Sequence, residues 1–121
     1  MGSSLEVHPK AQKIIEKLQK YKPDSIEREL LIVILTSIER LEKREFELLD
    51  IRKIQGEKNK GLKEIRIHSP LNYRIFFQEI EGCFYVAEIC AKKTDKFPQS
   101  FFDTIINRLK KMIYMIVSLF I

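Results

Sequence analysis

Residues 61–98 decide the fold of this chain, because they hold three short runs: GLKEIRI at 61–67, NYRIFF at 72–77 and AKKTDKFP at 91–98. The runs are rich in β-branched and aromatic residues, as strands are. The remaining positions are mostly basic, namely Lys63, Arg66, Arg74, Lys92, Lys93 and Lys96. A sheet with a cationic face or rim is suited to holding a polyanion.

Strand alternation assigns these side chains to faces. In the first two runs it points the isoleucines of both strands to one side. The opposite side then carries Glu64, Arg66, Arg74 and Phe76, on the face away from the helices. Two arginines on neighbouring strands need an anion or a carboxylate beside them, and Glu64 is the candidate carboxylate.

The chain on either side of this stretch is predicted to be helical first and extended later. Pro9 suits the first turn of a helix that reaches about residue 21. Asp24 and Glu27 form a capping box for a second helix that runs to about residue 46. The apolar period then changes from about 3.6 to about 2, which predicts strands over residues 48–54, 62–67, 73–80 and 83–91. Pro98 opens a last helix over residues 99–114, and residues 5–8 can add a short strand.

The pattern predicts one α+β domain over residues 1–121, with room for one hydrophobic core. An N-terminal helical hairpin packs on an antiparallel sheet of about four strands, and a C-terminal helix follows. Residues 1–4 are interpreted as a leader or a disordered end. The apolar tail 112–121 is shorter than the roughly 20 residues that cross a bilayer, so we expect a buried helix or a contact with another chain.

The charge is uneven along the chain. Residues 1–50 carry 9 Lys and Arg against 10 Asp and Glu, whereas residues 51–121 carry 13 against 7. The balance of +6 in the second half favours a localised anion site. Two cysteines and no secretory signal indicate a reducing, cytoplasmic setting.

The order of elements and the three motifs together resemble the RelE/ParE toxin superfamily, and in particular its phage-derived HigB-like branch. Members of that branch show patterns similar to G-L-x-E-[LI]-R-[IV], Y-R-[IV]-[FL]-[FY] and F-x-K-K-T-x-K-x-P, and the resemblance covers roughly residues 9–112. It implies the toxin of a type II toxin–antitoxin system, a ribosome-dependent endoribonuclease that cuts mRNA and is neutralised by a protein antitoxin. It also implies no cofactor, no metal, no membrane, and a homodimer or a toxin–antitoxin hetero-oligomer.

The resemblance implies roles for single residues. Arg74 matches the phosphate-stabilising arginine of the family's Tyr-Arg strand, and Arg66 with Glu64 matches the neighbouring Glu-x-Arg strand. Lys92, Lys93 and Lys96 match the basic loop before the last helix. We further expect RNA contacts from Lys60, Lys63, Lys92, Tyr73 and Phe97, with packing in the core as the alternative for the two aromatics.

Metal-free RNA cleavage lets the 2′-OH attack its own phosphodiester, so the site must remove one proton, stabilise the phosphorane and protonate the leaving oxygen. Arg66 and Arg74 suit the second task, because a guanidinium is permanently charged and matches two phosphate oxygens. The base stays open. The candidates are Glu64, a lysine of the 92–96 cluster, such as Lys93 or Lys96, whose pKa is depressed by like charge, and His68, which lies in a turn.

Two other functions fit the same fold. One is a ParE-type toxin that binds and inhibits DNA gyrase without catalysis. The other is a catalytically degenerate relic that only binds an antitoxin. A fold does not by itself choose among these.

Overall fold

The computed structural model describes residues 4–93 and 96–118, and its side chains up to Met115. The elements follow the order β1 (Ser4–Val7), α1 (Pro9–Leu18), α2 (Ile26–Glu42), η1 (Phe46–Leu48), β2 (Ile51–Lys53), η2 (Glu57–Asn59), β3 (Lys63–Ile67), β4 (Tyr73–Ile80), β5 (Cys83–Ala91) and α3 (Gln99–Ser118). The predicted α+β class is confirmed.

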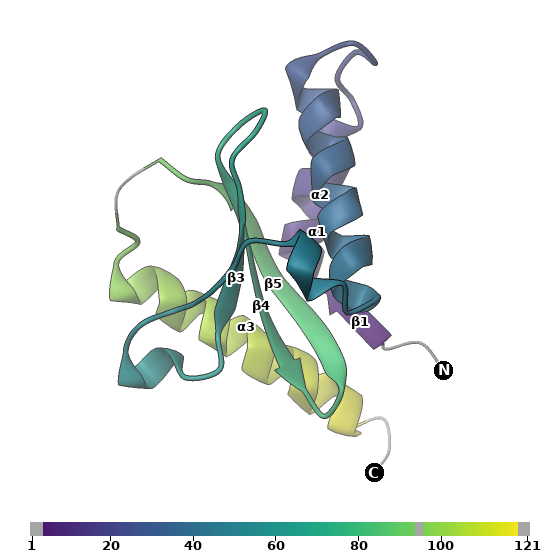
Figure 1. Cartoon of the computed structure of the whole chain (residues 1–121). Helices are drawn as coiled ribbons and strands as arrows, with labels where there is room; N and C mark the ends of the chain where they lie inside the picture. The colour runs from purple at the N-terminus through teal and green to yellow at the C-terminus, as the bar shows by residue number, and fades with distance from the viewer. Residues whose placement is uncertain (1–3, 94–95, 119–121) are drawn as a thin grey trace.

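One five-stranded sheet lies between the helices, as Figure 1 shows. Its strand order is β1-β5-β4-β3-β2, with α1 and α2 on one face and α3 on the other. The pairs β2–β3, β3–β4 and β4–β5 are antiparallel, as predicted. The short strand β1 joins the edge parallel to β5, so the sheet has one strand more than the four expected and is mixed.

The sheet separates two hydrophobic cores. The core under α1 and α2 takes Ile65, Ile67, Ile75 and Phe77 from the strands, which confirms their assignment to one face. The core under α3 contains Phe76 with Ile105 and Leu109. The expectation that the arginine face is free of helices is therefore wrong, since α3 packs along it.

Several predicted boundaries need correction. Helix α1 begins at Pro9 as predicted but ends at Leu18, and α2 ends at Glu42 rather than near residue 46. The N-cap of α2 is Ser25, whose Oγ accepts a hydrogen bond from the Arg28 N–H at 3.1 Å, so Asp24 does not form the capping box. The predicted strand 48–54 is shortened to β2, because a 3-10 turn occupies Phe46–Leu48.

The two ends of the chain are partly described. Ser4 belongs to β1, so the expectation of a disordered end is wrong for this residue, while residues 1–3 lie outside the described part. Helix α3 continues to Ser118, four residues past the predicted end. Within the apolar tail, Met112 and Ile113 pack on the α3 core, Tyr114 and Met115 are exposed, and residues 119–121 lie outside the described part.

Candidate functional site

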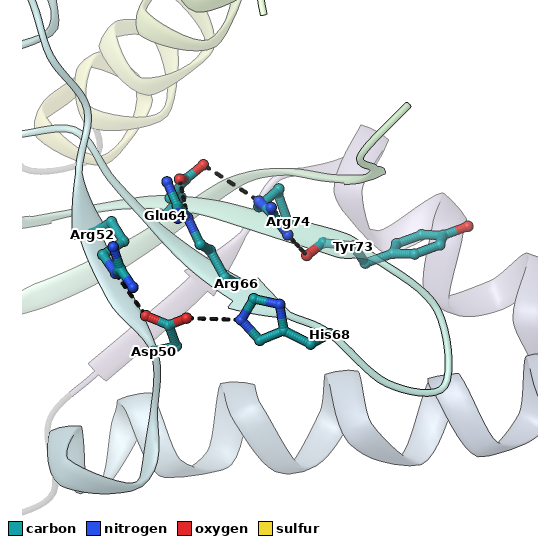
Figure 2. Close-up of polar contacts among 7 residues, drawn as sticks. All are labelled: Asp50, Arg52, Glu64, Arg66, His68, Tyr73 and Arg74. Atoms are coloured by element: carbon teal, nitrogen blue, oxygen red, sulfur yellow. Dashed lines mark hydrogen bonds and ion pairs between the residues drawn. The ribbon is translucent and has the colours of Figure 1, made fainter. Parts of the chain in front are cut away.

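Three charged side chains from β3 and β4 meet on the α3 face of the sheet. The antiparallel register pairs Arg66 directly with Arg74, and Glu64 lies two residues before Arg66 on the same face. Glu64 Oε1 accepts from Arg66 Nε at 2.8 Å, and Glu64 Oε2 lies 3.9 Å from Arg74 Nε. Figure 2 shows the carboxylate between the two guanidinium groups. The predicted grouping of these residues is confirmed in its geometry.

Burial makes this grouping more than a surface ion pair. The side chains of Glu64 and Arg74 are 8% and 10% exposed, whereas that of Arg66 is 35% exposed. Arg74 Nη1 also donates a hydrogen bond to the Tyr73 carbonyl at 3.0 Å, which fixes the orientation of the Arg74 guanidinium. Because both carboxylate oxygens of Glu64 face a guanidinium, its evident role is to hold the two arginines in place.

These three residues form the floor of a cleft of about 630 Å³. The walls come from residues 53–55 and Asn59 on one side, and from Lys92, Lys96 and Phe97 with the start of α3 on the other. The lining includes five cationic side chains, those of Lys53, Arg66, Arg74, Lys92 and Lys96, against the single carboxylate of Glu64. Such a concentration of positive charge favours an anionic ligand.

The aromatic wall of the cleft is built on Phe97. Its ring stacks on Phe101 with centroids 4.5 Å apart and meets Phe76 edge-on at 5.5 Å. Lys92 Nζ lies 4.3 Å from the centre of the Phe97 ring, a cation–π contact. Phe97 thus belongs to the α3 core and to the cleft at once, so both interpretations of this residue hold in part.

The opposite wall is tied to α3 by a pair of amides. Gln99 Nε2 donates to Asn59 Oδ1 at 2.9 Å, and Asn59 Nδ2 donates to Gln99 Oε1 at 3.1 Å. Asn59 is buried and also donates to the Gln55 carbonyl at 2.7 Å. The reciprocal amide pair connects the η2 loop to the first turn of α3 and closes this end of the cleft.

Four predicted residues lie elsewhere. Lys60 and Lys63 line a neighbouring cleft of about 790 Å³, which shares residues 53–55 with the first. Lys93 is exposed and is not among the residues that line the cleft, so its catalytic role stays a prediction. Tyr73 packs against the core under α1 and α2, where burial raises the pKa of its phenol, and so cannot stack an RNA base in the cleft.

Comparison with known proteins identifies the family of this chain. Residues 23–110 match the model of the family described as phage derived protein Gp49-like (DUF891). The chain belongs to the Gp49-like family. The expectation of a phage-derived family agrees with that description.

A solved structure of a mutant of the E. coli toxin RelE in the free state is similar in fold. The similarity covers 89% of this chain and 98% of that one, with 14% sequence identity and a TM-score of 0.48. None of the curated proteins matches the sequence significantly.

Next to the cleft floor, this Gp49-like protein carries a pair that sequence reasoning missed. His68 Nε2 lies 2.8 Å from Asp50 Oδ2, and Asp50 Oδ1 accepts from Arg52 Nε at 2.8 Å. Figure 2 shows these three side chains beside Arg66. The hydrogen bond from His68, and next the one from Arg52, lower the pKa of Asp50. Asp50 precedes β2 and His68 follows β3, and the antiparallel pairing of the two strands brings these residues together. Sequence reasoning missed the pair because it depends on this pairing of distant segments.

The described residues contain neither a cluster of metal ligands nor a membrane-spanning helix. No three His, Cys, Asp or Glu side chains in residues 4–93 and 96–118 are placed to hold a metal ion. In the same residues, no helix combines the length and hydrophobicity needed to cross a membrane.

Proposed function

We propose that this Gp49-like protein is the toxin of a type II toxin–antitoxin pair and that it cleaves mRNA on the ribosome. The observation that carries the proposal is the cleft floor, where a buried carboxylate orients two arginines beneath further cations. The family membership and the motif resemblance support the toxin assignment, with a protein antitoxin as partner.

The guanidinium groups suit the charge that develops during RNA cleavage. Attack of a 2′-OH on the adjacent phosphorus produces a phosphorane with extra negative charge on its oxygens. Glu64 engages the Nε atom of Arg66, and among the described residues no group hydrogen-bonds the terminal nitrogens of that arginine. These nitrogens can take two phosphate oxygens in a fork, and Arg74 stands directly opposite in the β-ladder. Groups already in place for the transition state add most to the rate.

The rest of the cleft suits a single RNA strand. Lys92 and Lys96 add charge for the backbone, and the Phe97 ring gives an apolar surface beside them. A positively charged groove with an aromatic face is the general arrangement of proteins that bind single strands without much sequence preference. Positioning by the ribosome supplies the remaining orientation of the attacked phosphodiester.

Primer extension on cellular mRNA after brief induction tests the proposal. We compare the wild type with Arg74→Gln and Arg66→Gln, and use Arg44→Gln as the matched control. Arg44 is likewise paired with a glutamate, Glu79, but on the surface away from the cleft. We expect translation-dependent breaks in the wild type and the control, and a loss of 100-fold or more in both cleft variants, on the order expected when a transition-state donor is removed.

Two outcomes overturn the proposal. Growth arrest with intact mRNA and broken DNA would indicate the gyrase-inhibiting function instead. Neither arrest nor cleavage, with an antitoxin still bound, would indicate a catalytically inactive relic. Circular dichroism of each purified variant separates a lost function from a lost fold.

A further inference from the structure

An imidazole and a carboxylate are held together at the edge of the cleft floor. Asp50 stands just before β2 and His68 just after β3. The Arg66 N–H donates to the Asp50 carbonyl at 2.9 Å, which extends the β2–β3 ladder by one residue and fixes the Asp50 backbone. On this frame, His68 Nε2 approaches Asp50 Oδ2 to 2.8 Å. The contact therefore rests on strand pairing and not on a chance approach of two loops.

The contact determines which ring nitrogen carries the proton. Asp50 is bound by Arg52 as well as by His68, and both hydrogen bonds lower its pKa, so it is ionised near neutral pH. An ionised carboxylate only accepts, so Nε2 of the neutral ring is the protonated nitrogen. The lone pair is then on Nδ1, at the ring edge away from Asp50, and no group among the described residues hydrogen-bonds Nδ1.

The position of the ring suits a reaction at Arg66. His68 follows Arg66 by two residues on the same face, so their Cα atoms lie roughly 7 Å apart along the strand. The His68 side chain is 62% exposed, so a substrate can reach it. Figure 2 shows the Arg66 guanidinium beside Glu64 and the His68 ring beside Asp50. An RNA strand that extends from a phosphate on Arg66 towards His68 would present its 2′-OH to the imidazole.

We propose that His68 is the general base of RNA cleavage in this cleft and that Asp50 is its positioning residue. This inference rests on the proposed ribonuclease function. His68 Nδ1 removes the proton from the 2′-OH, the 2′-oxygen forms a bond to phosphorus, and the bond from phosphorus to the 5′-oxygen breaks. The leaving 5′-oxygen takes a proton from water, and the imidazolium later returns its proton to water. The products are a 2′,3′-cyclic phosphate and a free 5′-OH.

Two other candidates for the base, Glu64 and Lys92, are less suitable. Both oxygens of Glu64 face arginines, and Lys92 is seated on the Phe97 ring. Among the described residues, Asp50 contacts the imidazole through Oδ2, and Arg52 contacts Asp50 through Oδ1. Asp50 stabilises the imidazolium formed in the step, while the guanidinium of Arg66 serves the phosphate.

The experiment is single-turnover cleavage of an mRNA on ribosomes, measured between pH 5 and pH 9 for the wild type, His68→Asn, Asp50→Asn and His8→Asn. His8 is the matched control, because it is the other histidine of the chain and caps α1 by accepting from the Lys10 N–H. Asparagine preserves such a cap. Affinity is measured separately with an mRNA that carries a 2′-deoxy nucleotide at the cleavage site.

We expect His68→Asn to lower the rate by roughly 100-fold or more, the usual worth of a general base, and to lose the fall in rate towards acidic pH. Asp50→Asn lowers the rate by about 10-fold or more, as loss of an orienting carboxylate commonly does. Affinity for the deoxy-substituted mRNA stays within about 3-fold in both, and His8→Asn behaves as the wild type.

Each alternative outcome refutes a definite statement. If the wild type cleaves, Arg74→Gln does not, and His68→Asn keeps the wild-type rate and pH profile, then His68 is not the base although the ribonuclease function stands. If the wild type cleaves no mRNA under any condition, the ribonuclease function falls and the role of His68 falls with it.

Discussion

Replacing Glu64 with glutamine tests whether one buried carboxylate holds the two arginines of the cleft. The Arg74 Nε atom lies 3.9 Å from Glu64, and unit charges about 4 Å apart attract by about 4 kcal/mol at an effective dielectric constant near 20. Removing one member of a buried ion pair typically costs about 3–5 kcal/mol, because the other charge is left buried. Arg66 is 35% exposed, so water can solvate its guanidinium after the carboxylate is removed. We therefore expect a loss near the lower limit, about 3 kcal/mol in the free energy of unfolding.

Urea unfolding followed by far-UV circular dichroism measures this loss in a chain without tryptophan. With an m value of about 1–3 kcal/mol per M, the midpoint should fall by roughly 1–3 M. Glu79→Gln is the matched control, because Glu79 also forms an ion pair with an arginine, Arg44. Both side chains of this pair are exposed, Glu79 to 37% and Arg44 to 40%. An exposed pair contributes less than about 1 kcal/mol. Equal midpoints for the two variants would refute the idea that Glu64 compensates Arg66 and Arg74.

Three further predictions concern other parts of the molecule. Phe97→Ala should lower the free energy of unfolding by about 2 kcal/mol, less than the 3–5 kcal/mol of a fully buried phenylalanine, because this ring is half-buried; an unchanged melting temperature would contradict it. The lowered pKa of Asp50 means that its contribution to stability is present at neutral pH and is lost as the pH falls through that pKa, so the difference in stability between the wild type and Asp50→Asn should shrink between pH 6 and pH 3. Burial raises the pKa of the Cys90 thiol to about 12, so iodoacetamide at pH 8 should leave Cys90 unmodified in the folded protein and alkylate it in urea, as read by mass spectrometry.

The sequence predicted the cleft floor because side-chain alternation is a local property. Once residues 62–67 and 73–80 are predicted as neighbouring strands, alternation places Glu64, Arg66 and Arg74 on one face, and the observed pairing of Arg66 with Arg74 agrees. The same alternation places Tyr73 on the side of Ile75, where it packs against the core under α1 and α2. Alternation therefore favours packing over RNA contact for Tyr73.

What the sequence missed depends on contacts between distant segments. The parallel pairing of β1 with β5 joins residues about 80 positions apart, and local patterns carry no information on it. The approach of His68 to Asp50 spans 18 positions and needs the register of β2 on β3. The amide pair between Asn59 and Gln99 spans 40 positions in the same way.

The charge of the cleft floor also explains why it contains a carboxylate at all. Two arginines alone would place +2 in a site where Arg74 is only 10% exposed, and they would repel each other before any ligand arrived. With Glu64 between them the floor carries +1, which matches the single negative charge of a bound phosphodiester. In the proposed cleavage the phosphodiester gains charge as it becomes a phosphorane. The terminal nitrogens of Arg66, which no group among the described residues hydrogen-bonds, would meet this increase without rearrangement. Lys53, Lys92 and Lys96 add further positive charge around this floor. In the proposed reaction, such a cleft would stabilise the more negative transition state more than the ground state, which is the requirement for catalysis.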